Sequence, residues 1–156
     1  MNGILNNLLF VTPKRKLIYA TDIHLGRPNN LFEQLSCSFP GLLALGVHTL
    51  DLSPRDKELH GWAARGLAYT CWMTYADQAT GLGPEEMTVD TRGGKWMGHV
   101  EKWNAEGRLG GVPPGLQEVD KVVNGHRDYT NRKRPHLLRP EVSHTVHLVF
   151  ELYDHQ

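Results

Sequence analysis

The segment 53–79 constrains the fold most strongly, because it carries the start, the periodicity and the end of a long helix. Ser53 is a favoured N-cap residue, Pro54 suits the first helical position, and Asp56 follows three residues after the cap. Small and apolar residues then recur every four positions, at Leu59, Ala63, Leu67 and Cys71. Gly81 favours an end shortly before it. The sequence therefore predicts an amphipathic helix that ends near Ala79.

Two short apolar runs near the N-terminus predict a β-hairpin. Residues 8–11 and 17–20 are apolar and partly β-branched, and the stretch 12–16 between them is polar. Residues 21–30 are rich in Gly, Pro and Asn, so we expect a loop there.

Residues 31–50 are apolar at most positions, but Pro40 and Gly41 stand in their middle. Because proline has no N–H to donate, this pair predicts a short helix, an interruption and a second short helix.

The remainder of the chain has weaker signals. Residues 81–135 are rich in glycine and show no sustained period, so we expect a long surface excursion with short strands within 89–96. After Pro140, apolar residues are spaced as in an amphipathic helix, at Val142, Val146, Val149 and Tyr153.

Composition narrows the class of protein. The 156 residues include 17 basic and 17 acidic side chains, and this balance gives no reason to expect nucleic acid or an anionic membrane surface as a partner. No apolar run approaches the roughly 20 residues of a membrane span, and the N-terminus lacks the order of a signal peptide. The length is typical of one globular domain.

Asp22 and His24 form an Asp-x-His pattern after the second apolar run. This pattern resembles the opening of the metallophosphoesterases, in which such ligands hold metals that activate water. The further metal-binding blocks of that family have no good match here, and the closest, Asn124-Gly125-His126, has its residues in another order. We therefore favour a polar loop, with a metallophosphoesterase-like protein as a minor alternative.

Four other blocks occur together and in order: residues 32–46 (FEQLSCSFPGLLALG), 66–71 (GLAYTC), 75–85 (YADQATGLGPE) and 128–141 (DYTNRKRPHLLRPE). In this order they resemble the class I α-1,2-mannosidases of glycoside hydrolase family 47, most closely the fungal type. The resemblance implies a mainly α fold: a fragment of an (α/α)7 barrel with a small β-hairpin and long loops. Residues 1–141 would then be an internal piece of the catalytic domain, from its middle toward its C-terminal third.

The resemblance implies roles for several residues. Glu85 and Glu141 match active-site carboxylates, with Glu141 in the place of the general base of an inverting hydrolase. Its position at a helix start is consistent with that role, because free N–H groups there favour an ionised carboxylate. Arg139 and Pro140 match the sugar-pocket turn before it. Gln34 stands where the family usually has a histidine that contacts the sugar.

Cys37 and Cys71 match the family's structural disulfide, which implies an oxidising compartment. The alternative from the residues alone is a pair of buried free thiols. The resemblance further implies Ca²⁺ as cofactor, held by a threonine that this chain does not contain, so we expect no metal ligand in this fragment. The expected partners are high-mannose N-glycans, in the endoplasmic reticulum or Golgi or outside the cell. Membrane association would come only through an N-terminal segment missing from this chain.

The sequence departs from the family after Glu141. His144 occupies the place of a second carboxylate, and Val142-Ser143 can be encoded by GTGAGT, a common splice-donor sequence. We therefore expect residues 142–156 to be a tail outside the family, produced by a retained intron. Because the proton-donating glutamate would lie upstream of this chain, we expect the isolated fragment to be inactive. A relative that binds high-mannose glycans without cutting them is the main alternative function.

Overall fold

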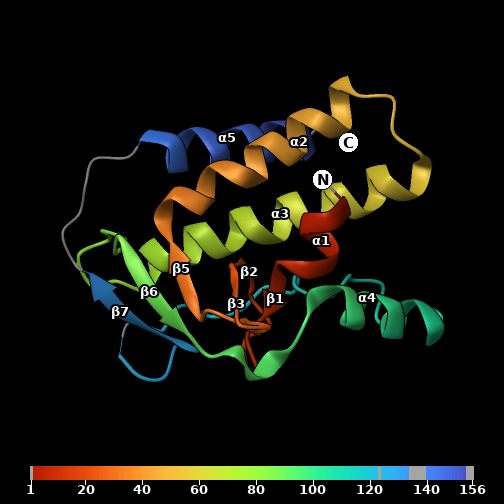
Figure 1. Ribbon diagram of the computed structural model, residues 1–156. Helices are drawn as coiled ribbons and strands as arrows, with labels where there is room; N and C mark the ends of the chain where they lie inside the picture. Colours follow the sequence, from red (N-terminus) through yellow and green to blue (C-terminus); the bar gives the residue numbers. More distant parts are fainter. Residues whose placement is uncertain (1, 123, 134–139, 154–156) are drawn as a thin grey trace.

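The computed structural model describes residues 2–122, 124–133 and 140–153. The long helix α3 lies beside α2 and α5, on one side of the small antiparallel sheets and of α4 (Figure 1). The elements in chain order are α1 (Asn2–Asn7), β1 (Leu9–Val11), β2 (Ile18–Ala20), β3 (Ile23–His24), β4 (Arg27–Pro28), β5 (Leu31–Glu33), the 3-10 helix η1 (Gln34–Ser38), α2 (Phe39–Thr49), α3 (Pro54–Ala76), β6 (Glu86–Val89), the 3-10 helix η2 (Thr91–Gly93), α4 (Trp96–Ala105), β7 (Tyr129–Lys133) and α5 (Pro140–Tyr153). The expectation of a mainly helical chain with small sheets is confirmed.

Helix α3 begins as its sequence predicts. The Ser53 side chain accepts a hydrogen bond from the backbone N–H of Asp56 at 3.1 Å, which satisfies one of the free donors of the first turn. The helix ends at Ala76, three residues earlier than expected, and Asp77 follows it as the C-cap residue.

Helix α2 corrects the expectation of an interruption at Pro40. Pro40 is the second residue of this helix, where its missing N–H has no helical partner to lose. The preceding residues form β5 and η1, so the apolar segment is a strand, a 3-10 turn and one helix. Gly41 lets α5 approach α2 closely: a Cβ there would lie 3.1 Å from Oγ1 of Thr145.

The N-terminal hairpin is confirmed, with β1 paired antiparallel to β2 in the register Phe10 to Tyr19. The expected loop at 21–30 contains a small additional ladder, β3 with β4. Strand β6 lies in the centre of a third sheet, between β5 and β7. The strands expected within 89–96 are absent apart from Val89, the last residue of β6, because this segment holds η2 and the start of α4. Strand β7 was not expected, because its sequence is polar.

Helix α4 corrects the reading of 81–135 as a surface excursion. Its buried side chains, Trp96, Met97, Val100 and Trp103, follow helical spacing. Flanking glycines obscured this short pattern in the sequence. The spacing after Pro140 is compatible with a helix, although a retained intron would make that pattern accidental. The structure has α5 there, packed against both α2 and α3.

The core has two parts. One lies between α2, α3, α4 and the hairpin, where small residues of α3 such as Ala63 and Ala64 are fully buried. The other surrounds a disulfide between Cys37 and Cys71 and includes Phe32, Met87 and Val142. No helix within the described residues is long and apolar enough to cross a lipid bilayer.

Candidate functional site

Gln34 joins two of the sequence blocks. It begins η1 directly after β5, and it is buried, with 1% of its surface exposed. Its backbone N–H donates to the carbonyl oxygen of Glu85 at 3.0 Å, and its side-chain Nε2 donates to the hydroxyl of Tyr75. Its Oε1 has no hydrogen-bond partner among the described residues. The first and third blocks therefore meet at this side chain.

Glu85 lies in the turn that leads from α3 into β6, and it is half-buried. Gly83, two residues earlier, lies directly against the ring of Tyr75: a Cβ on this glycine would be 2.8 Å from Cε2 of the tyrosine. The next residue, Glu86, pairs with Glu33 in the sheet. The close glycine contact and the strand pairing fix the backbone on both sides of Glu85.

The predicted disulfide is present. Cys37 in η1 and Cys71 in α3 are bonded, with 5.9 Å between their Cα atoms, and both are 1% exposed. Tyr75 follows Cys71 by one helical turn, so the disulfide and the Gln34–Tyr75 contact fasten η1 to the same end of α3.

The start of α5 lies beside this cluster. Val142 packs in the buried group around the disulfide, and α5 contacts η1. A groove of about 440 Å³ opens between α3 and α5, and its lining residues are Trp72, Tyr75, Val142, Ser143, Val146, His147 and Phe150. Pro140 begins α5 and Glu141 follows in its first turn, but their side chains and the whole of Arg139 lie outside the described residues. Their roles stay predictions.

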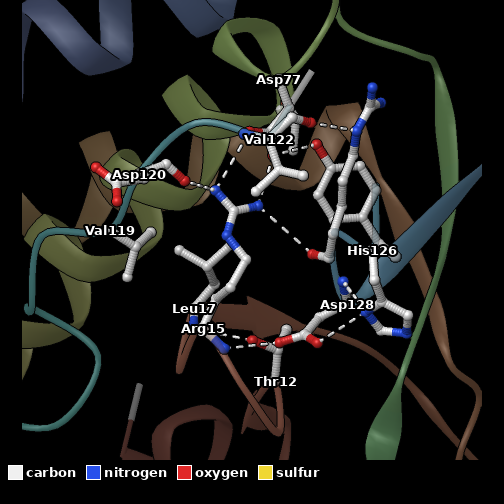
Figure 2. Close-up of polar contacts among 12 residues, drawn as sticks. Thr12, Arg15, Leu17, Asp77, Val119, Asp120, Val122, His126 and Asp128 are labelled. Carbon is white, nitrogen blue, oxygen red and sulfur yellow. Dashed lines mark hydrogen bonds and ion pairs between the residues drawn. The ribbon is translucent and has the colours of Figure 1, made fainter. Parts of the chain in front are cut away.

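Sequence reasoning missed a buried ionic network at the C-terminal end of α3 (Figure 2). Asp77 is fully buried and accepts two hydrogen bonds from the guanidinium of Arg15, at 2.6 and 3.2 Å. It also accepts from the hydroxyl of Tyr129 at 2.8 Å and from the backbone N–H of Val122 at 2.6 Å. Burial and the bond to Asp77 raise the pKa of Tyr129 well above its usual value.

A second buried carboxylate holds the turn of the N-terminal hairpin. Asp128 is 1% exposed, and its Oδ2 accepts from the backbone N–H groups of Lys14 and Arg15 at 2.9 and 2.8 Å (Figure 2). Its backbone has a φ of +66°, a left-handed conformation that aspartate tolerates better than most residues. The two carboxylates thus tie the hairpin turn, the end of α3 and the start of β7 together. The sequence offered one weak signal, since Asp77 and Asp128 both lie inside the quoted blocks.

The alternative metal pair is not assembled into a site. Asp22 lies just before β3 and His24 lies on it, and both are exposed. Within residues 2–122, 124–133 and 140–153, no group of three or more His, Cys, Asp or Glu residues stands where it could hold a metal ion. The metallophosphoesterase reading thus has no structural support.

The comparison with protein families identifies this chain as part of a glycoside hydrolase. A family model described as Glycosyl hydrolase family 47 matches residues 1–155, so the chain belongs to that family. The matched range includes 142–155, and the retained-intron origin of that segment stays a prediction for genomic sequence to test.

Two curated relatives share part of the sequence. The chain is 38% identical over 85 residues to proteins named endoplasmic reticulum mannosyl-oligosaccharide 1,2-alpha-mannosidase in Rattus norvegicus and in Mus musculus. The alignment covers 54% of this chain and 12% of each relative. The chain thus matches only a small part of the length of these relatives.

Proposed function

We propose that this chain forms part of the sugar-cleaving cavity of an α-1,2-mannosidase that trims high-mannose N-glycans. The observation that carries the proposal is the hydrogen bond from the Gln34 N–H to the Glu85 carbonyl oxygen, at 3.0 Å. It brings two blocks of the family pattern together beside the disulfide, and the first turn of α5 lies on the same side. The names of the rat and mouse relatives support the choice of substrate.

In this proposal the reaction is an inverting hydrolysis. A carboxylate on one side of the sugar takes a proton from the attacking water, and an acid on the other side protonates the leaving oxygen. Glu141 is the base, because the first turn of α5 presents free N–H groups that stabilise its ionised form. Glu85 is the second active-site carboxylate of this chain, and the proton donor lies outside the chain. Arg139 binds sugar hydroxyls, and Pro140 sets the turn that aims Glu141.

Gln34 takes the place of the family's sugar-contacting histidine in this proposal. Its Nε2 is held by Tyr75, and its Oε1 is buried and has no hydrogen-bond partner among the described residues, so contact with a sugar hydroxyl requires this side chain to move.

Calcium is the cofactor that family membership implies. Calcium prefers six to eight oxygen ligands, and the described residues offer no cluster of acidic side chains for it. The threonine that the resemblance assigns to calcium is not in this chain, so calcium stays a proposal for the longer protein, and none of the steps above depends on it.

Apolar side chains left at the surface support a larger parent domain, which we propose to be an (α/α)7 barrel. Leu35, Leu42 and Leu45 are 54%, 57% and 49% exposed, on η1 and the outer side of α2. Additional helices would cover this face. We therefore propose that the isolated chain is inactive, and that the parent protein works in the secretory pathway, as the disulfide and the named relatives suggest.

A glycan-binding relative without activity is the second candidate. It is favoured by Gln34 in the position of a histidine and by His144 in the position of a carboxylate. The two candidate functions differ only in whether the longer protein hydrolyses the glycan that it binds.

The experiment is an assay of mannose release from α-1,2-mannobiose with Ca²⁺. The 156-residue chain and the longest translated product that contains it are assayed side by side. We expect release by the longer product and none by the chain alone. Binding of the disaccharide without release by the longer product would favour the glycan-binding relative, and the absence of both would overturn the proposal. Comparison of genomic DNA with spliced transcripts around codon 142 tests the origin of the tail.

A further inference from the structure

A second pocket lies at the other end of α3, between the N-terminal part of this helix and α4. Its volume is about 470 Å³, within the range of small-ligand sites. Trp62 in this pocket precedes Tyr75 of the candidate site by 13 residues on the same helix, or about 20 Å at 1.5 Å per residue. The pocket is thus separate from the Gln34–Glu85 cluster.

The pocket has an aromatic wall that is held rigidly. Trp62 is half-buried, and its ring meets Trp103 edge to face, with 5.5 Å between the centroids and 81° between the planes. The guanidinium of Arg108 lies over both indoles, at 5.4 and 5.5 Å from their centroids. These contacts hold the indole of Trp62 in place before any ligand arrives.

The polar groups around this wall are also fixed. Arg108 donates two hydrogen bonds to the carboxylate of Glu58, at 2.8 and 3.0 Å, and one to Oδ1 of Asn104 at 3.0 Å. Glu101 and Arg55 complete the charged lining. Two arginines and two glutamates balance, so the pocket gives neither a cation nor an anion a net electrostatic advantage.

We propose that this pocket binds a neutral pyranose sugar, as a glycan-binding site separate from the hydrolytic one. A pyranose has a C–H face that packs on an indole, and hydroxyls that both donate and accept hydrogen bonds. Trp62 supplies apolar surface with the part of its indole that faces the pocket beside Arg108, and Glu101 supplies acceptors. The guanidinium N–H groups of Arg108 that are not bound to Glu58 or Asn104 supply donors. The balanced charge of the lining favours this ligand over a charged one.

The test is a titration of the 156-residue chain with methyl α-mannoside, followed by the indole N–H resonances of its tryptophans. We expect a saturable shift of the Trp62 resonance with a Kd on the order of millimolar, as for a single small ring. Replacement of Trp62 by Leu should weaken binding about threefold to tenfold, and replacement by Phe should restore part of it. The absence of a saturable shift would overturn the proposal.

Two variants with substitutions at exposed positions test the pocket even if the Trp62 variants do not fold. Glu101→Ala and Asn104→Ala change exposed side chains of α4, so the fold should stay intact by circular dichroism, while binding weakens. If both variants bind methyl α-mannoside as tightly as the wild type, the proposal that these residues line the sugar site is wrong. Glucosamine and glucuronic acid probe the charge argument, which fails if either binds more tightly than methyl α-mannoside.

The site is distinguishable from the hydrolytic one. Glu85→Gln should leave the Trp62 shift unchanged, whether or not any product that contains this chain releases mannose. A loss of the Trp62 shift in Glu85→Gln would mean that the two sites are one, and would overturn the proposal.

Discussion

Replacement of Asp77 by Asn should destabilise the fold strongly. The carboxylate is fully buried, and it accepts hydrogen bonds from Arg15, Tyr129 and the Val122 amide, at distances of 2.6–3.2 Å. Asparagine keeps the shape but removes the charge, and turns an NH₂ group toward donors. Arg15, whose side chain is 9% exposed, is then left as a buried charge without its partner. Breaking a buried ion pair in this way costs about 3–5 kcal/mol of the free energy of unfolding.

The assay is urea unfolding at neutral pH, followed by tryptophan fluorescence. We expect a lower midpoint with an unchanged slope, because the change acts on the folded state. The matched control is Asp90→Asn, which removes the partner of Arg92 at the surface, where the arginine side chain is 76% exposed. Such exposed pairs contribute little, so the control should unfold close to the wild type. If the two variants lose the same free energy, the role assigned to the buried network is wrong.

Three further changes test other parts of the structure. Replacing Cys37 and Cys71 by Ala opens a loop with a sequence separation of 34 residues, and should lower the free energy of unfolding by about 4 kcal/mol in urea titrations. Gly93→Ala would place a Cβ 2.0 Å from the carbonyl oxygen of Val11, so we expect a loss of about 1–3 kcal/mol in the same titrations. Because the pKa of Tyr129 is raised in the folded state, its contribution to stability should be fully present below pH 10 and be lost above it, by about 1.4 kcal/mol per pH unit. Tyr129→Phe should make the alkaline decline of stability less steep by that amount in unfolding experiments across that range.

Each of these expectations has a contrary result. Equal stability of the double alanine variant and the oxidised wild type would contradict the disulfide estimate. Gly98→Ala in α4 is the control for Gly93, because a Cβ at Gly98 meets nothing within 4 Å, and it should not destabilise the chain. An alkaline decline as steep in Tyr129→Phe as in the wild type would assign it to other groups, Tyr19 first among them, since burial raises its pKa too.

The parts of the fold that follow local rules could be predicted from the sequence. The cap at Ser53 and the four-residue spacing after it identified α3, and the two β-branched runs identified the hairpin. The prediction at Pro40 was wrong because proline interrupts the interior of a helix but is favoured at its start. Pro40 lies at a helix start because β5 precedes it, and β5 forms by pairing with the distant strand β6.

The elements that depend on distant partners could not be predicted. Strand β7 has a polar sequence and exists through its pairing with β6, whose residues lie 40 or more positions earlier. Asp77 and Arg15 are separated by 62 residues, and nothing local to either indicates the other. At the candidate site, the family pattern predicted the disulfide pair, which the structure confirms, and roles for Gln34 and Glu85 that stay predictions. The contact between Tyr75 and Gln34 was not predicted, because the two residues are far apart in the sequence.

The measurement closest to the central proposal is mannose release from α-1,2-mannobiose by the longest translated product that contains this chain. The comparison is between Glu85→Gln, Glu141→Gln and the strand neighbour Glu86→Gln. We expect the first two changes to lower kcat by about 100-fold or more, as for loss of an acid–base group, and Glu86→Gln to have little effect. Release that is equally fast in all three variants would show that these blocks do not line a sugar-cleaving cavity.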